Sequence, residues 1–271
     1  TIMTFPGVPA ELKQMWVQTA VPWLKQYGGA TGTLISRTLK ITGIPESILA
    51  EEVSDLLKQR NPTVAPYANL GEVKLRLTAR AASVETAGKL LIPLEEEIRK
   101  RIGPKCYGSD DESLISVVIN LLRQRSETLA VAESCTGGGL GTAISSIPGA
   151  SDVFLGGVIA YSNLMKEKLL TVPPEIINTY GAVSRQVVKA MAEGAREKTD
   201  SSWAIAISGL AGPSGGSQSK PVGLVHIAVA GLEGCEVTSH NFGSQRTRIG
   251  IQQLSVVCGL DQLRLLLLKQ S

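Results

Sequence analysis

The last 160 or so residues of this 271-residue chain alternate short apolar stretches with longer amphipathic ones, and this alternation constrains the fold more than any other feature. Apolar stretches predict strands over residues 128–132, 154–161, 203–208, 223–230 and 235–242. Apolar residues at helical spacing predict helices over residues 114–125, 185–198 and 247–269. Strands that alternate with helices predict a three-layer α/β/α domain over 109–271, and the two adjacent last strands predict a mixed sheet.

A small α+β domain is predicted upstream, over residues 29–108. Residues 71–79 alternate strictly between apolar and polar side chains, as in a strand of an antiparallel sheet that is covered on one face. A further strand is predicted over 33–41, and helices are predicted over 46–60 and 84–102. The side chains expected to point inward from the first of these helices are Ile48, Leu49, Val53, Leu56 and Leu57.

Residues 1–28 predict a short helix over about 10–26, in which Trp16 and Trp23 repeat at a heptad interval. Two tryptophans on so short a helix need a covering core that this segment cannot supply, so we expect it to dock on another domain. The chain begins at Thr1 without an initiator Met, which indicates a fragment or a processed product.

The composition excludes several function classes. A formal net charge of +3 is too small to indicate a nucleic acid or an anionic membrane as the main partner, and no unbroken apolar run is long enough to cross a bilayer. The four cysteines form no C-x-x-C pair and lie near no histidine at metal-ligand spacing. We expect a cytoplasmic protein with reduced thiols, with no metal ion and no cofactor, that forms a homodimer.

The segment Ala132–Gly139 carries the most chemistry. An apolar strand ends here and a helix begins shortly afterwards, so the hydroxyl of Ser134 is expected at the tip of a strand beside backbone N–H groups that lack intrahelical partners. Such donors hold an oxyanion or a phosphate. The alternative is that Ser134 only caps the helix, although Thr136 can fill that role equally well.

A serine nucleophile needs a base, and the two histidines are poorly placed to act as one. His226 lies within an apolar strand and His240 lies near a strand end, so a Ser-His-Asp triad is not favoured. Lys166 is the alternative, because it follows the predicted helix start at Ser162-Asn163, where the helix dipole disfavours a cationic amine. An ordinary solvated position for Lys166 remains open from spacing alone.

A second glycine-rich loop covers residues 208–217, again directly after an apolar strand. Ligands of open α/β sheets bind beyond the carboxyl ends of the strands, so the loops after residues 132, 161 and 208 predict one pocket. The loop matches neither the P-loop nor the dinucleotide-binding pattern. Arg246 and Arg248, at the start of the last helix, either meet a phosphate or carboxylate there or lie on an exposed face.

Four motifs in series resemble the CinA C-terminal family over roughly residues 112–270. They are Ala132–Gly138, Tyr161-Ser162-Asn163 with Lys166, Gly181–Ser184, and Ile207–Gly216 with Lys220–Gly223. Members of this family are nicotinamide mononucleotide deamidases of the PncC type, which use a Ser-Lys pair. The resemblance therefore implies that Ser134 is the nucleophile, that Lys166 is its general base, and that the substrate is a pyridine mononucleotide.

The loop positions and the resemblance together define a predicted site. Its catalytic residues are Ser134, Lys166 and Tyr161, where Tyr161 orients the lysine or relays a proton. Its oxyanion- and substrate-binding residues are Glu133, Cys135, Thr136, Gly137, Gly138, Ser208, Gly209, Ala211, Gly212 and Arg246. The 5′-phosphate is expected to bind helix N-termini, the 208–217 loop or Arg246.

The upstream residues resemble other parts of the longer CinA proteins. Residues 61–67 and 71–79 look like the KH-type middle domain, and Pro6–Pro9 with Met15-Trp16 look like the tail of a molybdopterin-binding-like N-terminal domain. The resemblance implies that residues 1–28 are the C-terminal remnant of that domain and that the missing N-terminal domain is their intramolecular partner. The pyrophosphatase activity of that domain is not assigned to this chain. The only G-x-x-G, Gly29–Gly32, lies in the predicted linker, so the KH resemblance implies no RNA binding.

Three alternatives remain at this stage. Cys135 instead of Ser134 can be the nucleophile of the same amidase. The glycine-rich turns can serve a non-catalytic nucleotide-binding or regulatory module. Lys74, Arg76 and Arg80 can form an RNA-binding face, although no stacking aromatic is evident beside them in the sequence.

Overall fold

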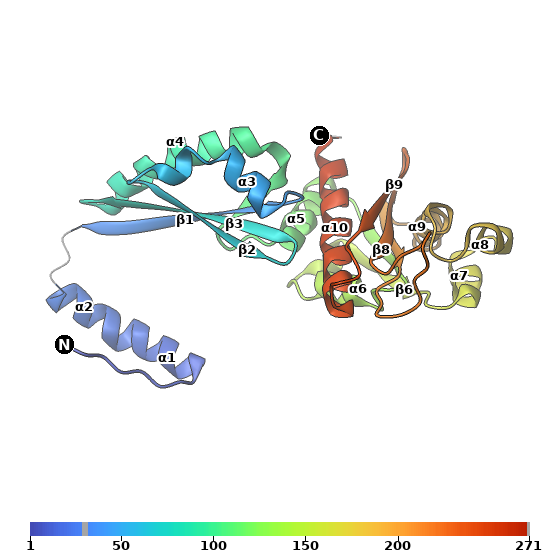
Figure 1. Cartoon of the computed structure of the whole chain (residues 1–271), viewed down its shortest axis with the longest axis horizontal. Coiled ribbons are helices and arrows are strands. Elements are labelled where there is room, and N and C mark those ends of the chain that lie inside the picture. Colours follow the sequence, from blue (N-terminus) through green and yellow to red (C-terminus); the bar gives the residue numbers. More distant parts are fainter. Residues whose placement is uncertain (29–31, 270–271) are drawn as a thin grey trace.

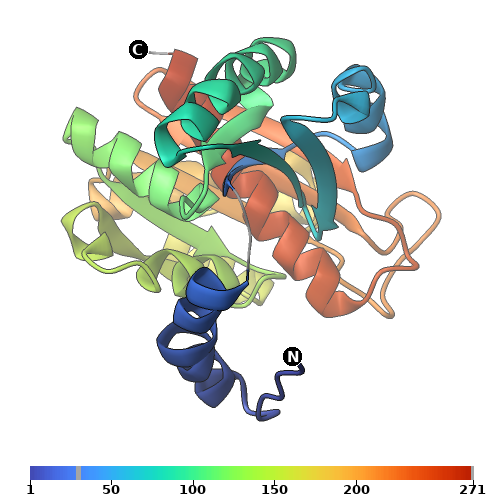
Figure 2. The same cartoon turned by 90° about the vertical axis from the view of Figure 1, so that its left-hand side faces the viewer.

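The computed structural model of the chain describes residues 1–28 and 32–269. The predicted linker at 28–32 and its G-x-x-G fall partly on residues 29–31, which lie outside the described residues. Residues 9–27 form one helical rod made of α1 (Pro9–Met15), the π-helical segment η1 (Trp16–Ala20) and α2 (Val21–Tyr27). The rod lies apart from both sheets (Figures 1 and 2). The indole of Trp16 packs on Phe5 but stays 44% exposed.

The first sheet is antiparallel and has the strand order β2-β3-β1-β4. Its strands are β1 (Thr33–Thr42), β2 (Thr63–Asn69), β3 (Glu72–Ala81) and β4 (Cys106–Ser109). α4 (Val84–Ile102) covers one face, where Val73, Leu75 and Leu77 are buried as the alternation predicts (Figure 1). Ser83 caps α4 by accepting a hydrogen bond from the N–H of Thr86. The 3₁₀ turn η3 (Gly103–Lys105) follows α4.

The helix predicted over 46–60 is wrong in length. α3 covers only Glu46–Glu52, and a separate 3₁₀ turn, η2, covers Leu56–Lys58. Three of the side chains predicted to point inward, Leu49, Val53 and Leu56, are buried, although they lie on a short helix and a turn and not on one helix. Ile48, which was also predicted to point inward, is exposed. β2 and β4 were not predicted, because β2 contains Pro66 at a sheet edge and β4 is only four residues long.

The second sheet is mixed, with the order β6-β5-β7-β8-β9. β5 (Leu129–Glu133) lies parallel to β6 (Phe154–Ile159) and β7 (Trp203–Gly209), and β8 (Leu224–Gly231) and β9 (Gly234–Asn241) continue antiparallel. Helices lie on both faces, so the predicted three-layer α/β/α architecture is confirmed (Figure 1). The helices and turns of this part are α5 (Leu114–Arg125), α6 (Gly139–Ser145), η4 (Ala150–Asp152), α7 (Asn163–Leu170), α8 (Pro174–Tyr180), α9 (Arg185–Thr199) and α10 (Arg248–Lys269).

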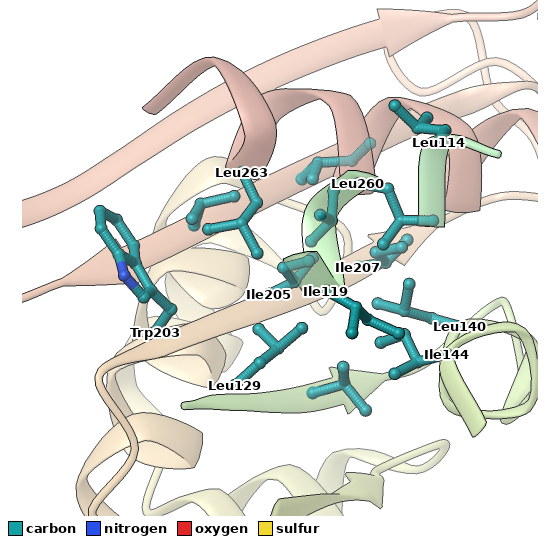
Figure 3. Packing of buried hydrophobic residues seen from close by; sticks show 14 of the residues in the cluster. Leu114, Ile119, Leu129, Leu140, Ile144, Trp203, Ile205, Ile207, Leu260 and Leu263 are labelled. Carbon is teal, nitrogen blue, oxygen red and sulfur yellow. The ribbon is translucent and has the colours of Figure 1, made fainter. Parts of the chain in front are cut away.

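The two faces of the second sheet differ in side-chain size. On one face, large apolar residues of β5, β7 and β8 pack against α5 and α10, as shown around Ile205, Ile207 and Leu263 in Figure 3. On the other face the same strands present alanines to α9: Ala130, Ala132, Ala204, Ala206, Ala228 and Ala230. Small side chains allow a helix to approach a sheet closely, so the alternation of large and small residues fixes which helix covers which face.

α10 is long and apolar enough to cross a bilayer by length and composition, with a mean hydropathy of 1.2 over its best stretch. The expectation that no segment reaches this length considered only unbroken apolar runs. Half of that stretch is buried, and α10 packs on α5, β7 and β8. The guanidinium of Arg264 is buried within the protein, where it pairs with Asp261 and donates to the carbonyl of Pro104. These contacts are those of a core helix.

The open face of the first sheet carries the basic residues of the RNA-binding alternative. Lys74 pairs with Glu72 at 3.2 Å, and Arg76 donates to the hydroxyl of Ser36. Tyr67 is exposed on β2 directly opposite Lys74, so an aromatic does lie on this face. Lys74 is nevertheless paired with a carboxylate and Arg76 is bonded to a hydroxyl of the same sheet, which weakens the case for an RNA-binding face.

We expect Gly194→Ala to destabilise the C-terminal part of the chain by about 3 kcal/mol, because an added Cβ on α9 would lie 1.9 Å from the carbonyl oxygen of Leu170 in α7. Gly88→Ala in α4 is the matched control, since its Cβ would meet nothing within 4 Å. That change should stabilise by roughly 0.5–1 kcal/mol through helix propensity. Urea denaturation of both variants measures this, and an unchanged midpoint for Gly194→Ala would refute the close packing of α7 on α9.

Candidate active site

Ser134 is the first residue after β5, and the turn that follows it is held by backbone hydrogen bonds. Its N–H donates to the carbonyl of Ile207 in the neighbouring strand β7, and its own carbonyl accepts from Gly137. Gly137 and Gly138 have φ values of +60° and +100°, a region that glycine adopts without the steric cost of a Cβ. These glycines allow the chain to reverse within a few residues and to enter α6 at Gly139.

Lys166 lies in α7, whose start is capped by the hydroxyl of Ser162. Its Nζ lies 3.1 Å from the Oγ of Ser134, although 32 residues separate the two in the sequence. The same Nζ lies 2.8 Å from the carbonyl oxygen of Ala160 and 3.3 Å from that of Tyr161. Lys166 is only 1% exposed, so these three oxygens are the surroundings of a buried amine.

Burial lowers the pKa of Lys166, because removal from water disfavours the cationic form. The weaker effect of Cys135 acts in the opposite direction. Among the residues that the structure describes, no carboxylate forms an ion pair with this amine. A neutral amine has two N–H donors and one lone pair. The two carbonyls can take the donors, which leaves the lone pair facing the hydroxyl of Ser134, the arrangement that a general base requires.

Glu133 supports the nucleophile turn and does not face the pocket. Its carboxylate is 1% exposed and accepts hydrogen bonds from the backbone N–H groups of Gly138, Leu140 and Gly141. Glu133, not Ser134, therefore caps α6, which removes the alternative that Ser134 is only a cap. The predicted role of Glu133 in substrate binding is not met by this geometry.

Two of the predicted oxyanion donors, the backbone N–H groups of Gly137 and Gly138, are already used within the protein. The N–H of Gly137 is bonded to the carbonyl of Ser134 and the N–H of Gly138 to Glu133, so neither is available to a substrate. Within residues 1–28 and 32–269, the N–H of Thr136 has no acceptor, and the N–H of Cys135 has none apart from the sulfur of its own side chain. Cys135 lines the pocket, and Thr136 follows it within the turn.

The thiol of Cys135 lies beside the nucleophile position but is poorly suited to replace it. Burial raises its pKa to about 11, and the opposing effects of Arg248 and Lys166 are smaller. Since the thiolate is the reactive form, such a thiol is almost wholly unreactive near neutral pH. The geometry therefore favours Ser134 over the alternative nucleophile.

A cavity of about 270 Å³ opens above this pair. The three predicted loops meet there: Ser134 and Cys135 from the first, Tyr161 from the second, and Ser208, Gly209, Ala211 and Gly212 from the third. A fourth segment, Ala182-Val183, completes one wall and is held by a hydrogen bond from the Ser208 hydroxyl to the Ala182 carbonyl. This segment lies in a motif noted for its family resemblance, but it was missed as a site because its side chains carry no polar chemistry.

Arg248 reaches the pocket and Arg246 does not. The guanidinium of Arg248 donates to the carbonyl of Gly212 at 2.7 Å and to the hydroxyl of Tyr161 at 2.8 Å. Arg246 instead donates to the carbonyl of Phe242 and lines a separate cavity of about 640 Å³ between the first sheet and α10. The predicted assignment of Arg246 is thus not met. Arg246 precedes α10, which begins at Arg248, and sequence spacing alone did not show which of the two side chains faces the pocket.

Tyr161 contributes differently from the prediction. Its backbone carbonyl contacts the Lys166 amine, whereas its exposed ring turns its hydroxyl to Arg248. The hydroxyl is therefore placed to bind substrate with Arg248 and not to relay a proton from Lys166. The histidines lie elsewhere: His226 is bonded to the hydroxyl of Ser239, and His240 stacks on Phe242. Neither lines the pocket, which agrees with the expectation of no histidine base.

Comparison with known proteins places this geometry in a family. Residues 111–267 match the family profile described as the CinA C-terminal domain, and residues 36–108 match the damage-inducible protein CinA KH domain. A CinA-like protein of Prochlorococcus marinus (strain MIT 9313) is 63% identical over the whole chain. A CinA-like protein of Parasynechococcus marenigrum (strain WH8102) is 58% identical, and the chain spans 63–65% of the length of these two relatives.

Solved structures of CinA-family proteins match a little over half of this chain. The competence/damage inducible protein CihA from Agrobacterium tumefaciens is 37% identical, with a TM-score of 0.55, over 57% of this chain and 93% of that one. The competence damage-inducible protein A (ComA) from Klebsiella pneumoniae is 30% identical, with a TM-score of 0.56, over 58% of this chain and 97% of that one.

We expect Lys166→Met to become less stable relative to the wild type as pH rises from neutral towards 10.5. Below the lowered folded-state pKa, lysine is protonated in both states and burial of the cation costs stability. Between the folded-state pKa and the ordinary lysine pKa of 10.5, the unfolded chain binds more protons, so wild-type stability rises with pH. Urea unfolding of both proteins across this range measures the difference, and Lys168→Met, an exposed site in the same helix, should show none.

Proposed function

The chain belongs to the CinA family, and we propose that its last 160 or so residues hydrolyse the amide of nicotinamide mononucleotide to nicotinate mononucleotide and ammonia. The observation that carries this proposal is the 3.1 Å contact between the buried amine of Lys166 and the hydroxyl of Ser134. The family resemblance supplies the substrate class, and the pair supplies the chemistry.

The first half of the reaction forms an ester. Neutral Lys166 accepts the hydroxyl proton of Ser134 as the oxygen attacks the carboxamide carbon. The carbonyl oxygen becomes an oxyanion, which binds the N–H groups of Cys135 and Thr136, since neither donates to another residue of the described chain. Protonated Lys166 then gives its proton to the leaving nitrogen. The carbon–nitrogen bond breaks, and ammonia departs while the acyl group stays on Ser134.

The second half restores the enzyme. Lys166, neutral again, removes a proton from water, and the resulting hydroxide attacks the ester carbon. The same two N–H groups serve the second oxyanion. Collapse breaks the ester bond, returns the proton from Lys166 to the oxygen of Ser134, and releases the pyridine carboxylic acid, whose proton passes to the ammonia to give carboxylate and ammonium. One water is consumed for each ammonia released, so atoms and charge balance.

The phosphate of the substrate has a cationic partner at the mouth of the pocket. Arg248 is exposed, and no carboxylate of the described residues pairs with it. Two of its N–H groups are used on Gly212 and Tyr161, which holds the planar guanidinium in one orientation and leaves further donors for an anion. Arg248 is therefore the group we assign to the substrate phosphate.

A non-catalytic nucleotide-binding module is the alternative function. Such a module requires the same pocket and the same Arg248. It gives no reason, however, why the buried Lys166 should lie beside the hydroxyl of Ser134 and have no carboxylate partner among the described residues. An ammonia assay with nicotinamide mononucleotide, free nicotinamide and the dinucleotide separates the two. A mononucleotide that raises the melting temperature without releasing ammonia would favour the binding module.

We expect Ser134→Ala and Lys166→Arg each to lower ammonia release by at least about 10³-fold, because the first removes the nucleophile and the second installs a base that cannot lose its proton. Mononucleotide binding to Ser134→Ala should be nearly unchanged. Cys135→Ala is the matched control and should retain most activity, whereas loss of activity in Cys135→Ala alone would transfer the nucleophile to the thiol.

We expect Arg248→Met to lower kcat/KM for the mononucleotide by ~10–100-fold, the range typical of a lost hydrogen bond to a charged group. The loss should be far smaller for the nucleoside that lacks the phosphate. Arg246→Met, two residues away and outside the pocket, is the control and should leave both substrates unaffected. Equal losses for the phosphorylated and unphosphorylated substrates would show that Arg248 does not bind the phosphate.

A further inference from the structure

Gln252 reaches the nucleophile turn from a distant part of the chain. It lies one turn after Arg248 in α10, and its Nε2 donates to the carbonyl oxygen of Cys135 at 2.8 Å. The other carbonyl at the centre of this turn, that of Ser134, is held from within the turn by Gly137. Gln252 is thus the external side chain that anchors the backbone directly after the nucleophile.

The hydrogen bond to Cys135 also determines where the next N–H points. A trans peptide is planar, with its C=O and N–H directed oppositely, so holding the Cys135 carbonyl towards α10 directs the N–H of Thr136 away from it. Thr136 is 6% exposed, and its N–H finds no acceptor in the described part of the chain. Its hydroxyl is also buried without a partner.

Unpaired donors on a buried residue are rare in native structures. The unpaired N–H of Thr136 follows Cys135, whose own N–H has only its thiol as a partner and which lines the pocket, so these two backbone donors indicate a turn that can bind an acceptor from outside the protein. An oxyanion forming on a carbonyl attacked by Ser134 is an acceptor of that kind. Misdirecting the peptide would leave Ser134 and Lys166 in contact and would weaken only the stabilisation of the transition state.

We propose that Gln252 is a positioning residue of the active site: its hydrogen bond to the Cys135 carbonyl sets the Cys135–Thr136 peptide so that the backbone N–H groups of this turn bind the oxyanion. This inference rests on the proposed Ser-Lys chemistry, but it does not depend on which amide is hydrolysed. Gln252 touches neither substrate nor reacting atoms and acts through the peptide that it holds.

A fluorophosphonate probe tests the inference independently of the substrate. The Oγ of Ser134 attacks phosphorus, an O–P bond forms, the P–F bond breaks with fluoride leaving, and the hydroxyl proton passes to Lys166. Because the phosphoryl oxygen takes up negative charge as the amide oxygen would, the labelling rate depends on the same donors. The full chain is labelled and the modified residue is identified by mass spectrometry, with Ser134→Ala as the blank.

We expect Gln252→Met, which keeps the length but removes the donor, to slow labelling by ~10–100-fold. Gln252→Glu, which faces the carbonyl with a second acceptor, should be slower still, and Gln252→Lys, which restores a donor, should recover part of the rate. Gln253→Met on the exposed side of the same helix is the matched control and should label as the wild type does. With a turned-over amide, the loss should appear in kcat, with KM and the unfolding midpoint nearly unchanged.

Labelling of Gln252→Met at the wild-type rate would overturn the inference, and so would a loss that Gln253→Met shares. Absence of labelling in the wild type would also overturn it, since no activated serine would then exist to be positioned. Failure of the proposed function looks different. If the wild type releases no ammonia from pyridine nucleotides but Ser134 is labelled and Gln252→Met slows that labelling, the substrate assignment fails and the role of Gln252 stands.

Discussion

A buried amine without a carboxylate is the constraint on which the rest of the site depends. Lys166 is removed from water, and the oxygens around it are a hydroxyl and two backbone carbonyls, none of which carries a charge. A nearby carboxylate would hold the proton on the lysine and prevent it from acting as a base. The carboxylate adjacent in sequence to the nucleophile, Glu133, is directed instead to the start of α6. One acidic group thus stabilises the turn without neutralising the base.

The sheet brings this pair together through the size of its side chains. Alanines on one face of β5, β7 and β8 let α9 lie close, and Gly194 of α9 lets α7 approach in turn. Lys166 is carried by α7, so its depth beside Ser134 follows from small residues that have no chemistry of their own. Burying the amine costs folding free energy, and the packing of α7 and α9 offsets this cost. Sites whose function needs an unfavourable protonation state often reduce the stability of the fold in this way.

The sequence predicts the framework of the site better than its details. The three loops meet because strands ending at one sheet edge must place their following residues together, a consequence of parallel pairing that periodicity reveals. Lys166 was identifiable from its helix start and its family motif. The side-chain choices between near neighbours were not: Glu133 against Thr136 as the helix cap, or Arg248 against Arg246 as the pocket cation. Those choices depend on the direction in which neighbouring side chains point, which the spacing of residues in the sequence does not determine. Ala182-Val183 lacked any polar signal, and β2 and β4 are stabilised by neighbours that lie far away in sequence.

α10 connects these local choices to the rest of the molecule. Its first turns hold the Gly212 carbonyl, the Tyr161 hydroxyl and the Cys135 carbonyl, one contact to each of three loops. The turn between β2 and β3 of the first sheet packs on the same stretch of the helix, with Gly71 against Leu254 and Val257 and with Leu70 near Gly250. A Cβ at Gly71 would press on those side chains at 3.2–3.3 Å, so the hairpin fits closely against the helix. The first sheet therefore does more than precede the second sheet in the chain: its hairpin packs on the helix whose first turns contact the three loops around Ser134.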